Sequence, residues 1–415
     1  MSTSRDKRRV VITGMGAVTP LGNDVATFWK GIRNGECGID EITRYDTSNL
    51  KVKLAGEVRN IDFSEYIPKS ELRKSDLFTK FAVVAAKEAF EQSGIVLDES
   101  NEDRCGVMIS SGIGGLTTIA SEHSRGLERG FDKVSPYFVP MSITNIAAGT
   151  VAINHGIKGI CTCVVTACAG GTNAIGDAFR YVRDGYAEMM LCGGTEASIN
   201  ELGMGGFTSL RALSESTDKN RASIPFDKER NGFVMGEGAG ILFIEELEHA
   251  LNRGANIITE IVGYGVSCDA HHITAPDPSG AGATKSMKNA IKDADLEASQ
   301  IDYINAHGTS TPLNDKSETL AVKQAFGEHA KELYMSSTKS MTGHLLGASG
   351  AIESIITAMS LKDGFVPPTI NYQVPDEECD LNIVPNKGIE ADIQYALSNS
   401  LGFGGHNATL IFKKY

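Results

Sequence analysis

The stretch that decides the fold is CTCVVTACAGGTNAIGDAF, residues 161–179. Residues 161–165 are uncharged and rich in β-branched side chains, which predicts a strand buried on both faces. Behind the pair Gly170-Gly171, apolar residues recur at helical spacing, and the two glycines are expected to leave room for a substrate. Cys168 lies at the junction, where unpaired N–H groups and the positive end of the helix dipole favour a thiolate. The alternative is that Cys168 is a small buried apolar residue, like most free cysteines.

The length, charge and cysteine content of the chain exclude several classes of protein. At 415 residues it is longer than one hydrophobic core usually holds, so two domains or two fused halves are expected. The net charge of −13 argues against nucleic acid or an anionic membrane as a partner. Eight cysteines in a chain of this length, with no secretory signal at its start, predict reduced thiols in the cytoplasm.

Neither a metal site nor a membrane span is expected. Cys161, Cys163 and Cys168 lack a second Cys/His pair at zinc-ligand spacing. Residues 159–176 are uncharged, but their Thr, Asn and Gly content and internal turn argue against a membrane-spanning helix.

Strands and helices alternate along the chain, which predicts parallel sheets with helices on their faces. The alternation begins again near Asn256, so two similar halves are expected, residues 1–255 and 256–415. Gly14-Met15-Gly16 follows a strand at 9–13 and suggests a dinucleotide-binding turn, but the third glycine is missing and a structural turn is favoured. The remaining predicted strands are 105–110, 187–192, 241–245, 257–266 and 301–306, and the remaining helices are 23–33, 76–92, 283–293 and 315–326.

Two histidines lie in small polar loops at the ends of these elements. His307 follows a buried strand, at the carboxyl edge where α/β proteins place their sites. His344 and Lys339 share a loop ahead of a helix that starts near Ala348. A lone histidine is usually structural, but two in Gly/Thr/Ser loops, together with Cys168, favour a catalytic site.

Four stretches resemble a known family. They are TACAGG around Cys168, NAHGTSTPLND around His307, KSMTGHLLGASG from Lys339 and NSLGFGGHNA around Phe403. In this order they resemble the β-ketoacyl-[acyl carrier protein] synthases of subgroup I/II, and most closely the type II branch. The resemblance implies an α/β thiolase fold, in which duplicated halves form a five-layer α-β-α-β-α sandwich and the chain forms a homodimer.

The resemblance also implies a decarboxylating Claisen condensation in fatty acid elongation. Cys168 would take an acyl group from acyl carrier protein, and malonyl-[acyl carrier protein] would then lose CO2. His307 and His344 would donate hydrogen bonds to the enolate oxygen, and the backbone N–H groups of Cys168 and Phe403 would bind the second oxyanion. The product would be 3-oxoacyl-[acyl carrier protein]. No metal or organic cofactor is implied, because the substrates are carried on the phosphopantetheine arm of the carrier.

Further site residues are implied by the same resemblance. Lys339 would be a fixed positive charge paired with Glu318. The other implied residues are Thr309 and Thr311 on the pantetheine arm and malonyl group, Ile113 and Phe403 as gates of the acyl pocket, and Asp269 with His272 as a supporting network.

A basic cluster stands out in this acidic chain. Lys69, Arg73 and Lys74 lie close together, with Arg211 further along. One interpretation is a docking site for the acidic carrier protein, and the other is an ordinary solvated helix end.

Four other functions are alternatives. A polyketide-type ketosynthase is one alternative, because the sequence does not separate fatty acid synthesis from a specialised pathway. A chain-length-factor-like partner subunit is another, but such subunits lack the nucleophile that Cys168 supplies. A thiolase acting on coenzyme A thioesters needs a second cysteine near the carboxyl end, and no cysteine follows Cys379. A type III initiating synthase pairs Cys and His with Asn, but Lys339 and His344 occupy the final motif here.

Overall fold

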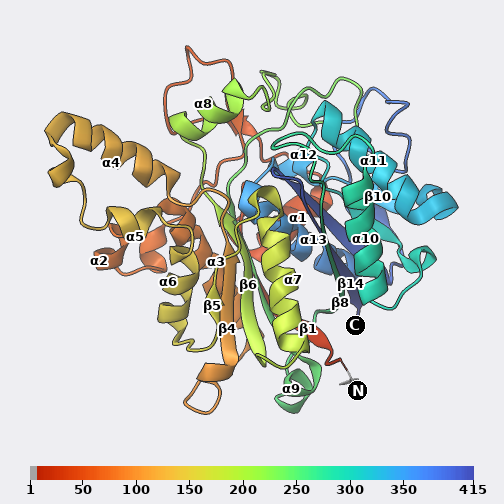
Figure 1. The fold of residues 1–415 in the computed structure, drawn as a ribbon, viewed down its shortest axis with the longest axis horizontal. Helices are drawn as coiled ribbons and strands as arrows, with labels where there is room; N and C mark the ends of the chain where they lie inside the picture. The colour runs from red at the N-terminus through yellow and green to blue at the C-terminus, as the bar shows by residue number, and fades with distance from the viewer. Residues whose placement is uncertain (1–6) are drawn as a thin grey trace.

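Residues 7–415 are described by the structure, a computed structural model with a mixed sheet of ten strands at its centre (Figure 1). The order across the sheet is β5-β4-β6-β7-β1-β8-β14-β13-β9-β10. The strand bounds are β1 Val10–Val18, β4 Cys105–Ser110, β5 Cys161–Thr162, β6 Met189–Glu196, β7 Gly238–Glu246, β8 Thr259–Cys268, β9 Tyr303–Asn305, β10 Tyr334–Ser336, β13 Tyr395–Gly402 and β14 His406–Lys414.

The same strand arrangement occurs twice in this sheet. Outward from the middle, β1-β7-β6-β4-β5 matches β8-β14-β13-β9-β10. In both halves the two inner pairings are antiparallel and the two outer pairings are parallel. The halves join where residues 10–12 of β1 pair with residues 259–261 of β8. The predicted duplication is confirmed, whereas parallel pairing is found only toward the two outer edges.

The helices form three layers around the two half-sheets. Helices α7 and α13 pack against each other and against strands of both halves. Helices α3 and α6 cover the outer face of the first half-sheet, and α10 and α11 cover that of the second, which confirms the predicted α-β-α-β-α sandwich (Figure 1). The helix bounds are α1 Val25–Asn34, α2 Lys69–Leu72, α3 Leu77–Ser93, α4 Leu116–Arg129, α5 Phe138–Ser142, α6 Ile146–His155, α7 Gly170–Arg183, α8 Glu201–Ser209, α9 Leu247–Asn252, α10 Ala281–Asp293, α11 Pro312–Phe326, α12 Lys339–Thr342 and α13 Ser349–Asp363.

Local sequence signals set the ends of α3. The Asp76 side chain caps its first turn by accepting a hydrogen bond from the Phe78 N–H group. Gly94 ends the helix in the left-handed conformation, with φ at 66°. The helix predicted at 76–92 is therefore confirmed to within one residue at each end.

The predicted turn at Gly14-Met15-Gly16 is wrong, because these residues continue β1. A Cβ atom on Gly14 would lie 2.0 Å from the Ala89 carbonyl oxygen, and one on Gly16 would lie 1.9 Å from that of Ala85. Both glycines are thus used where the backbone of α3 packs directly on the backbone of β1.

The strand predicted at 161–165 is reduced to the two residues of β5. This strand forms the outer edge of the first half-sheet, and Cys161 is exposed rather than buried on both faces. Residues 163–165 leave the sheet to carry the chain toward Cys168, so the short apolar run serves as an approach to the site.

We predict that Gly16→Ala destabilises the fold by about 1–3 kcal/mol, because α3 must move away from β1 to admit the methyl group. Gly205→Ala is the matched control, since Gly205 is an exposed position of helix α8 and a Cβ atom there meets nothing within 4 Å. Urea unfolding of the two variants tests this; an equal midpoint for Gly16→Ala and the unchanged protein would contradict the packing argument.

Candidate active site

Residues from all four motifs meet at one cavity of about 90 Å³. Cys168, His307, His344 and Phe403 line it. Thr309, Thr311 and Asp269 also line the cavity, as do Phe207 and Phe233, which sequence reasoning did not single out. The cavity lies at the carboxyl end of β9 and at the start of α7, where the two halves of the chain meet.

Cys168 lies in a short 3-10 turn, Ala167–Ala169, that leads directly into α7. Its side chain is almost completely buried, with 7% of the residue exposed. A Cβ atom on Gly170 would lie 2.0 Å from Ser110 Oγ, and one on Gly171 would lie 2.9 Å from the Ala351 nitrogen. The expectation that these glycines leave room for a substrate is therefore wrong. They let α7 approach β4 and α13 closely.

The resting Cys168 side chain is a thiol. Burial raises the pKa of Cys168 to about 12, although the Lys339 ammonium and the backbone N–H groups of Phe403 and Cys168 itself lower it. The thiolate expected from the helix end is therefore wrong, because the cost of burying the charge exceeds the gain from nearby donors.

The two histidine rings lie beside each other in the cavity wall. Their centroids are 5.3 Å apart and their planes are almost perpendicular. His344 Nδ1 lies 2.8 Å from Ser349 Oγ, and the Phe233 ring packs against the imidazole in a T-shaped arrangement. Burial and the Lys339 charge hold the pKa of both histidines well below the usual value, so both rings are neutral at pH 7. A neutral imidazole can donate one hydrogen bond without a charge change.

Lys339 is a buried cation, with 1% of its surface exposed, in the short helix α12. Its Nζ atom lies 2.5 Å from Glu353 Oε1 and 3.5 Å from His307 Nδ1. Glu318 instead accepts hydrogen bonds from the backbone N–H groups of His307 and Gly308, at 2.8 and 2.7 Å. The predicted Lys339–Glu318 pair is therefore wrong, because Glu318 is used by the backbone and Glu353 holds the ammonium group.

Two carboxylates near the site were missed at the sequence level. Glu353 partners Lys339, and Glu196 accepts hydrogen bonds from the N–H groups of Gly112, Ile113 and Gly347. Burial raises the pKa of both carboxyl groups to about 7. Each is the single charged residue in a long apolar stretch, 189–200 for Glu196 and 345–361 for Glu353. A single charged residue within a stretch that is otherwise expected to be buried indicates a buried carboxylate, and a buried carboxylate needs hydrogen-bond or ionic partners. This pattern was the sequence signal that could have identified both residues.

Of the implied gate and substrate-binding residues, Phe403, Thr309 and Thr311 line the cavity and Ile113 does not. Ile113 is half-buried in the apolar cluster that contains Cys168 and Leu346. The Phe403 ring lies 6.3 Å from that of Phe207. Thr309 Oγ1 and Thr311 Oγ1 lie 2.9 Å apart and form one hydroxyl pair.

Asp269 and His272 occupy different environments. Asp269 lines the cavity and accepts hydrogen bonds from Asn407 Nδ2 and the Asp277 N–H group. His272 is exposed, and its Nδ1 accepts hydrogen bonds from the Thr274 and Ala275 N–H groups. Among residues 7–415, no hydrogen bond joins Asp269 to His272. Of these two residues, only Asp269 lines the cavity.

The basic cluster lies away from the cavity, on and beside α2. Lys69 and Arg73 are exposed around a shallow hollow, whereas Lys74 pairs with Glu71 at 2.8 Å. Arg211 is exposed two residues beyond α8. Lys69, Arg73 and Arg211 are therefore the more available positive charges.

Within residues 7–415, no group of three or more His, Cys, Asp or Glu side chains is placed to hold a metal ion. In the same part of the chain, every helix is too short or too polar to cross a membrane.

Family models and curated relatives match the chain over most of its length. The model of the beta-ketoacyl synthase N-terminal domain matches residues 7–250, and that of the C-terminal domain matches residues 258–373. A Synechocystis sp. protein named 3-oxoacyl-[acyl-carrier-protein] synthase 2 is 53% identical over 411 residues, covering 99% of both chains. A Staphylococcus aureus protein of the same name is 54% identical over 408 residues, covering 98% of this chain and 99% of the relative.

Solved structures show the same fold. The ishigamide ketosynthase/chain length factor superposes with a TM-score of 0.93 at 35% identity, covering 99% of this chain and 100% of that chain. A type II polyketide ketosynthase, solved in complex with its acyl-carrier protein, superposes with a TM-score of 0.91 at 35% identity. The match covers 99% of this chain and 100% of that chain. The synthase 2 relatives, at 53–54% identity, are thus much more similar in sequence to this chain than these two solved structures, at 35%. The chain belongs to the β-ketoacyl synthase family.

Proposed function

We infer that this protein catalyses the condensing step of fatty acid elongation, joining an acyl group to a malonyl unit with loss of CO2. The observation that carries this is the meeting of one buried thiol and two neutral imidazoles at a single cavity, with the buried ammonium group of Lys339 3.5 Å from His307 Nδ1. The 53–54% identity to proteins named 3-oxoacyl-[acyl-carrier-protein] synthase 2 favours this over a polyketide-type enzyme or a chain-length-factor-like subunit.

In the first half-reaction, Cys168 sulfur attacks the thioester carbonyl of the acyl group. The thiol proton ends on the departing pantetheine sulfur, and a new thioester forms on Cys168. The transient oxyanion is bound by the N–H groups of Cys168 and Phe403. Close approach supports this assignment, because a Cβ atom on Gly402 would lie 3.3 Å from the Cys168 nitrogen.

In the second half-reaction, the malonyl thioester loses CO2 and its carbonyl oxygen becomes an enolate. His307 and His344 donate hydrogen bonds to that oxygen, and donors fixed in a buried site need little rearrangement as charge develops. Lys339 adds a fixed positive charge 3.5 Å from His307 Nδ1. The enolate carbon then attacks the acyl-Cys168 carbonyl, and the departing thiolate takes up a proton.

The substrates reach this cavity on a carrier arm. We assign the hydroxyl pair of Thr309 and Thr311 to the pantetheine and malonyl groups, and Ile113 and Phe403 to the acyl-pocket walls. Asp269 supports the loop beside Phe403, since a Cβ atom on Gly405 would lie 2.9 Å from Asp269 Cβ. Lys69, Arg73 and Arg211 are the surface charges we assign to docking of an acidic acyl carrier protein.

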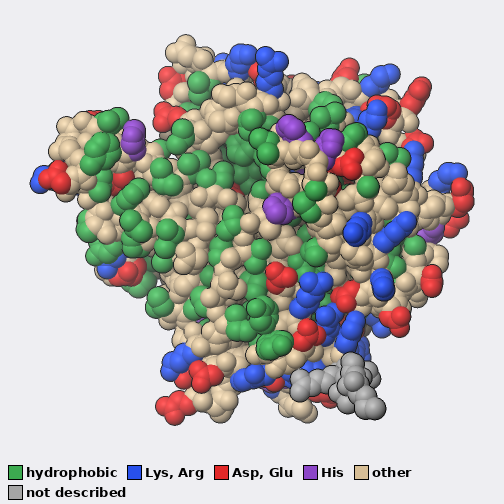
Figure 2. Space-filling model, in the orientation of Figure 1, with side chains coloured by type: hydrophobic (Ala, Val, Ile, Leu, Met, Phe, Trp, Pro, Cys, Tyr) green, Lys and Arg blue, Asp and Glu red, His purple; other side chains and the backbone are tan. Residues whose placement is uncertain are grey.

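We propose that the working protein is a homodimer. Exposed apolar side chains gather over α4, α5 and α6 on one side of the molecule, beside the open edge strand β5 (Figure 2). A patch of this kind on a folded chain commonly marks a protein interface. The exposed residues are Leu127, Phe131, Tyr137, Val139, Ile143 and Ile153.

Two further assignments accompany this proposal. We place the boundary between the halves at 255/256, in the connection between α9 and β8. We place the reaction in the cytoplasm, because all eight cysteines are free, as expected in a reducing compartment.

His344→Ala separates the two half-reactions. We expect the variant to acquire an acyl group on Cys168 when mixed with acyl-[acyl carrier protein], because the imidazole is a donor to the enolate and not the base for the thiol. Decarboxylation of malonyl-[acyl carrier protein] should fall roughly a hundred- to a thousandfold with one oxyanion donor removed. Mass spectrometry of the protein and CO2 release measure the two steps.

Cys168→Ala is the control for this experiment and should lose acylation and condensation together. An acyl group on another cysteine of that variant would refute the proposed nucleophile, and normal CO2 release by His344→Ala would refute the proposed donor.

The pKa of the thiol gives a pH prediction. A pKa near 12 means that the folded protein holds the thiol proton at neutral pH and releases it only as pH rises. Alkylation of Cys168 by iodoacetamide in the absence of substrate should therefore speed up about tenfold per pH unit between about pH 7 and 9. Site-resolved mass spectrometry follows the rate; a plateau in this range would show a resident thiolate instead.

Charge reversal tests the docking surface. Lys69→Glu with Arg73→Glu should raise the Michaelis constant for carrier-bound substrate and leave a small thioester substrate unaffected, with the difference shrinking as salt increases. Lys285→Glu with Lys288→Glu, on exposed positions of α10, is the matched control. Equal kinetics for the two double variants would show that the cluster is an ordinary solvated surface.

A further inference from the structure

Arg230 is a buried arginine at an unusual place, the N-terminus of α11. Only 4% of its side chain is exposed. Its Nε atom donates to the Thr311 carbonyl oxygen at 3.3 Å, and its Nη2 atom donates to that of Pro312 at 3.1 Å. The N-terminus of a helix is its positive end and disfavours a cation. This contact therefore needs compensation, which the surrounding carboxylates supply.

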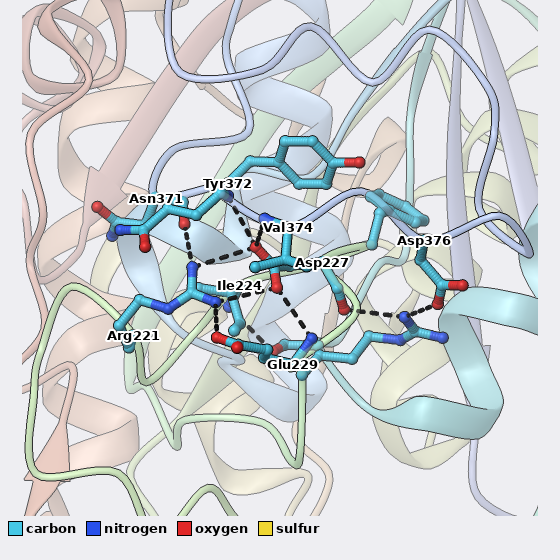
Figure 3. A network of polar contacts seen from close by, with 12 residues as sticks. Arg221, Ile224, Asp227, Glu229, Asn371, Tyr372, Val374 and Asp376 are labelled. Carbon is cyan, nitrogen blue, oxygen red and sulfur yellow. Dashed lines mark hydrogen bonds and ion pairs between the residues drawn. The ribbon is translucent and has the colours of Figure 1, made fainter.

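Those carboxylates connect three segments. Arg230 Nη1 lies 2.5 Å from Asp376 Oδ2, and the guanidinium lies 3.7 Å from Asp315 Oδ2. Asp227 accepts hydrogen bonds from the Gln373 and Val374 N–H groups, which ties the segment before Arg230 to residues 373–376. Figure 3 shows Asp227 between Arg221 and the Val374 backbone, with Asp376 at the far end of the network.

The other side of this contact carries the hydroxyl pair. Thr311 is the N-cap residue of α11, and its hydroxyl meets that of Thr309 at the cavity. Between them, Ser310 has φ at 70°, a left-handed conformation that is unfavourable for a residue with a side chain. The Ile224 and Gly232 N–H groups hold Ser310 through its side-chain and carbonyl oxygens. The turn is thus fixed from outside by residues 224–232.

The same helix also supports His307. Glu318 lies two turns after Thr311 on α11 and accepts the His307 and Gly308 N–H groups. The placement of the first turns of α11 therefore sets both the threonine pair and the backbone at His307.

We propose that Arg230 is a positioning residue for substrates that carry a pantetheine arm. Its planar fork fixes the Thr311 and Pro312 carbonyl groups and thereby orients the hydroxyls of Thr309 and Thr311 toward the arm. Lysine keeps the charge but cannot reproduce the fork. The proposal rests on the proposed function, because it needs those two hydroxyls to contact the pantetheine group.

The test compares two malonyl thioesters, one of pantetheine and one of ethanethiol, with the full-length protein. Arg230→Lys should lower kcat/KM for decarboxylation of the pantetheine thioester about tenfold, mainly through KM, and change that of the ethyl thioester by less than about twofold. In a protein that already carries Thr309→Val and Thr311→Val, adding Arg230→Lys should not lower kcat/KM for the pantetheine thioester any further. The effects of residues that act through one another are not additive.

Two more variants separate positioning from stability. Asp376→Asn leaves Arg230 in place without its carboxylate anchor and should produce the same selective loss, so the proposal stays testable if Arg230→Lys fails to fold. Arg221→Lys is the matched control, since Arg221 contacts Asp227, Glu229 and the Asn371 carbonyl but not α11. It should lower the thermal midpoint without a selective change in KM.

Each outcome is decisive. Two results would overturn the positioning role while the proposed function stands. One is an equal fall in kcat/KM for both thioesters in Arg230→Lys. The other is a further tenfold fall when Arg230→Lys is added to Thr309→Val with Thr311→Val. A wild-type protein that decarboxylates neither thioester, nor the carrier-bound substrate, would overturn the proposed function itself.

Discussion

The close contact between α7 and α13 is the constraint on which the site depends. A Cβ atom on Gly350 would lie 2.0 Å from Thr172 Oγ1, so the two helices approach closely only with glycine at this position. Cys168 lies just before the first of these helices, and His344 lies just before the second. Because equivalent helices of the two halves pack side by side, the loops that precede them are brought to one cavity.

Burial acts in opposite directions on the groups of this cavity. It raises the pKa of Cys168 and lowers the pKa of His307 and His344, because in each case it disfavours the charged form. The resting site thus holds neutral nucleophile and neutral donors around one compensated ammonium, Lys339. All three shifts have one cause, the free-energy cost of placing a charge where water cannot solvate it.

Sequence reasoning succeeded where the signal is local or carried by a motif. Strand β4 was predicted with its observed ends, since 105–110 is a short apolar run with clear boundaries, and α3 has both a cap and a glycine stop. Reasoning failed where a partner distant in sequence decides the outcome. A glycine is needed at position 14 because α3 packs against it, and α3 begins more than sixty residues further along the chain. Lys339 pairs with Glu353 and not with Glu318, because Glu318 accepts a hydrogen bond from the His307 backbone N–H group. That contact cannot be read from the sequence.

The position of β14 in the sheet has a consequence for how the protein is made. This strand, the last of the ten in sequence, lies between β13 and β8 and not at an edge. The first half-sheet is complete once β7 has been synthesised, whereas the second has a gap in its interior until β14 arrives. During synthesis the thiol-bearing half can therefore form first, as N-terminal units commonly do. The histidine-bearing half waits for nearly the whole chain, so a nascent protein holds the nucleophile before it holds the groups that make condensation possible.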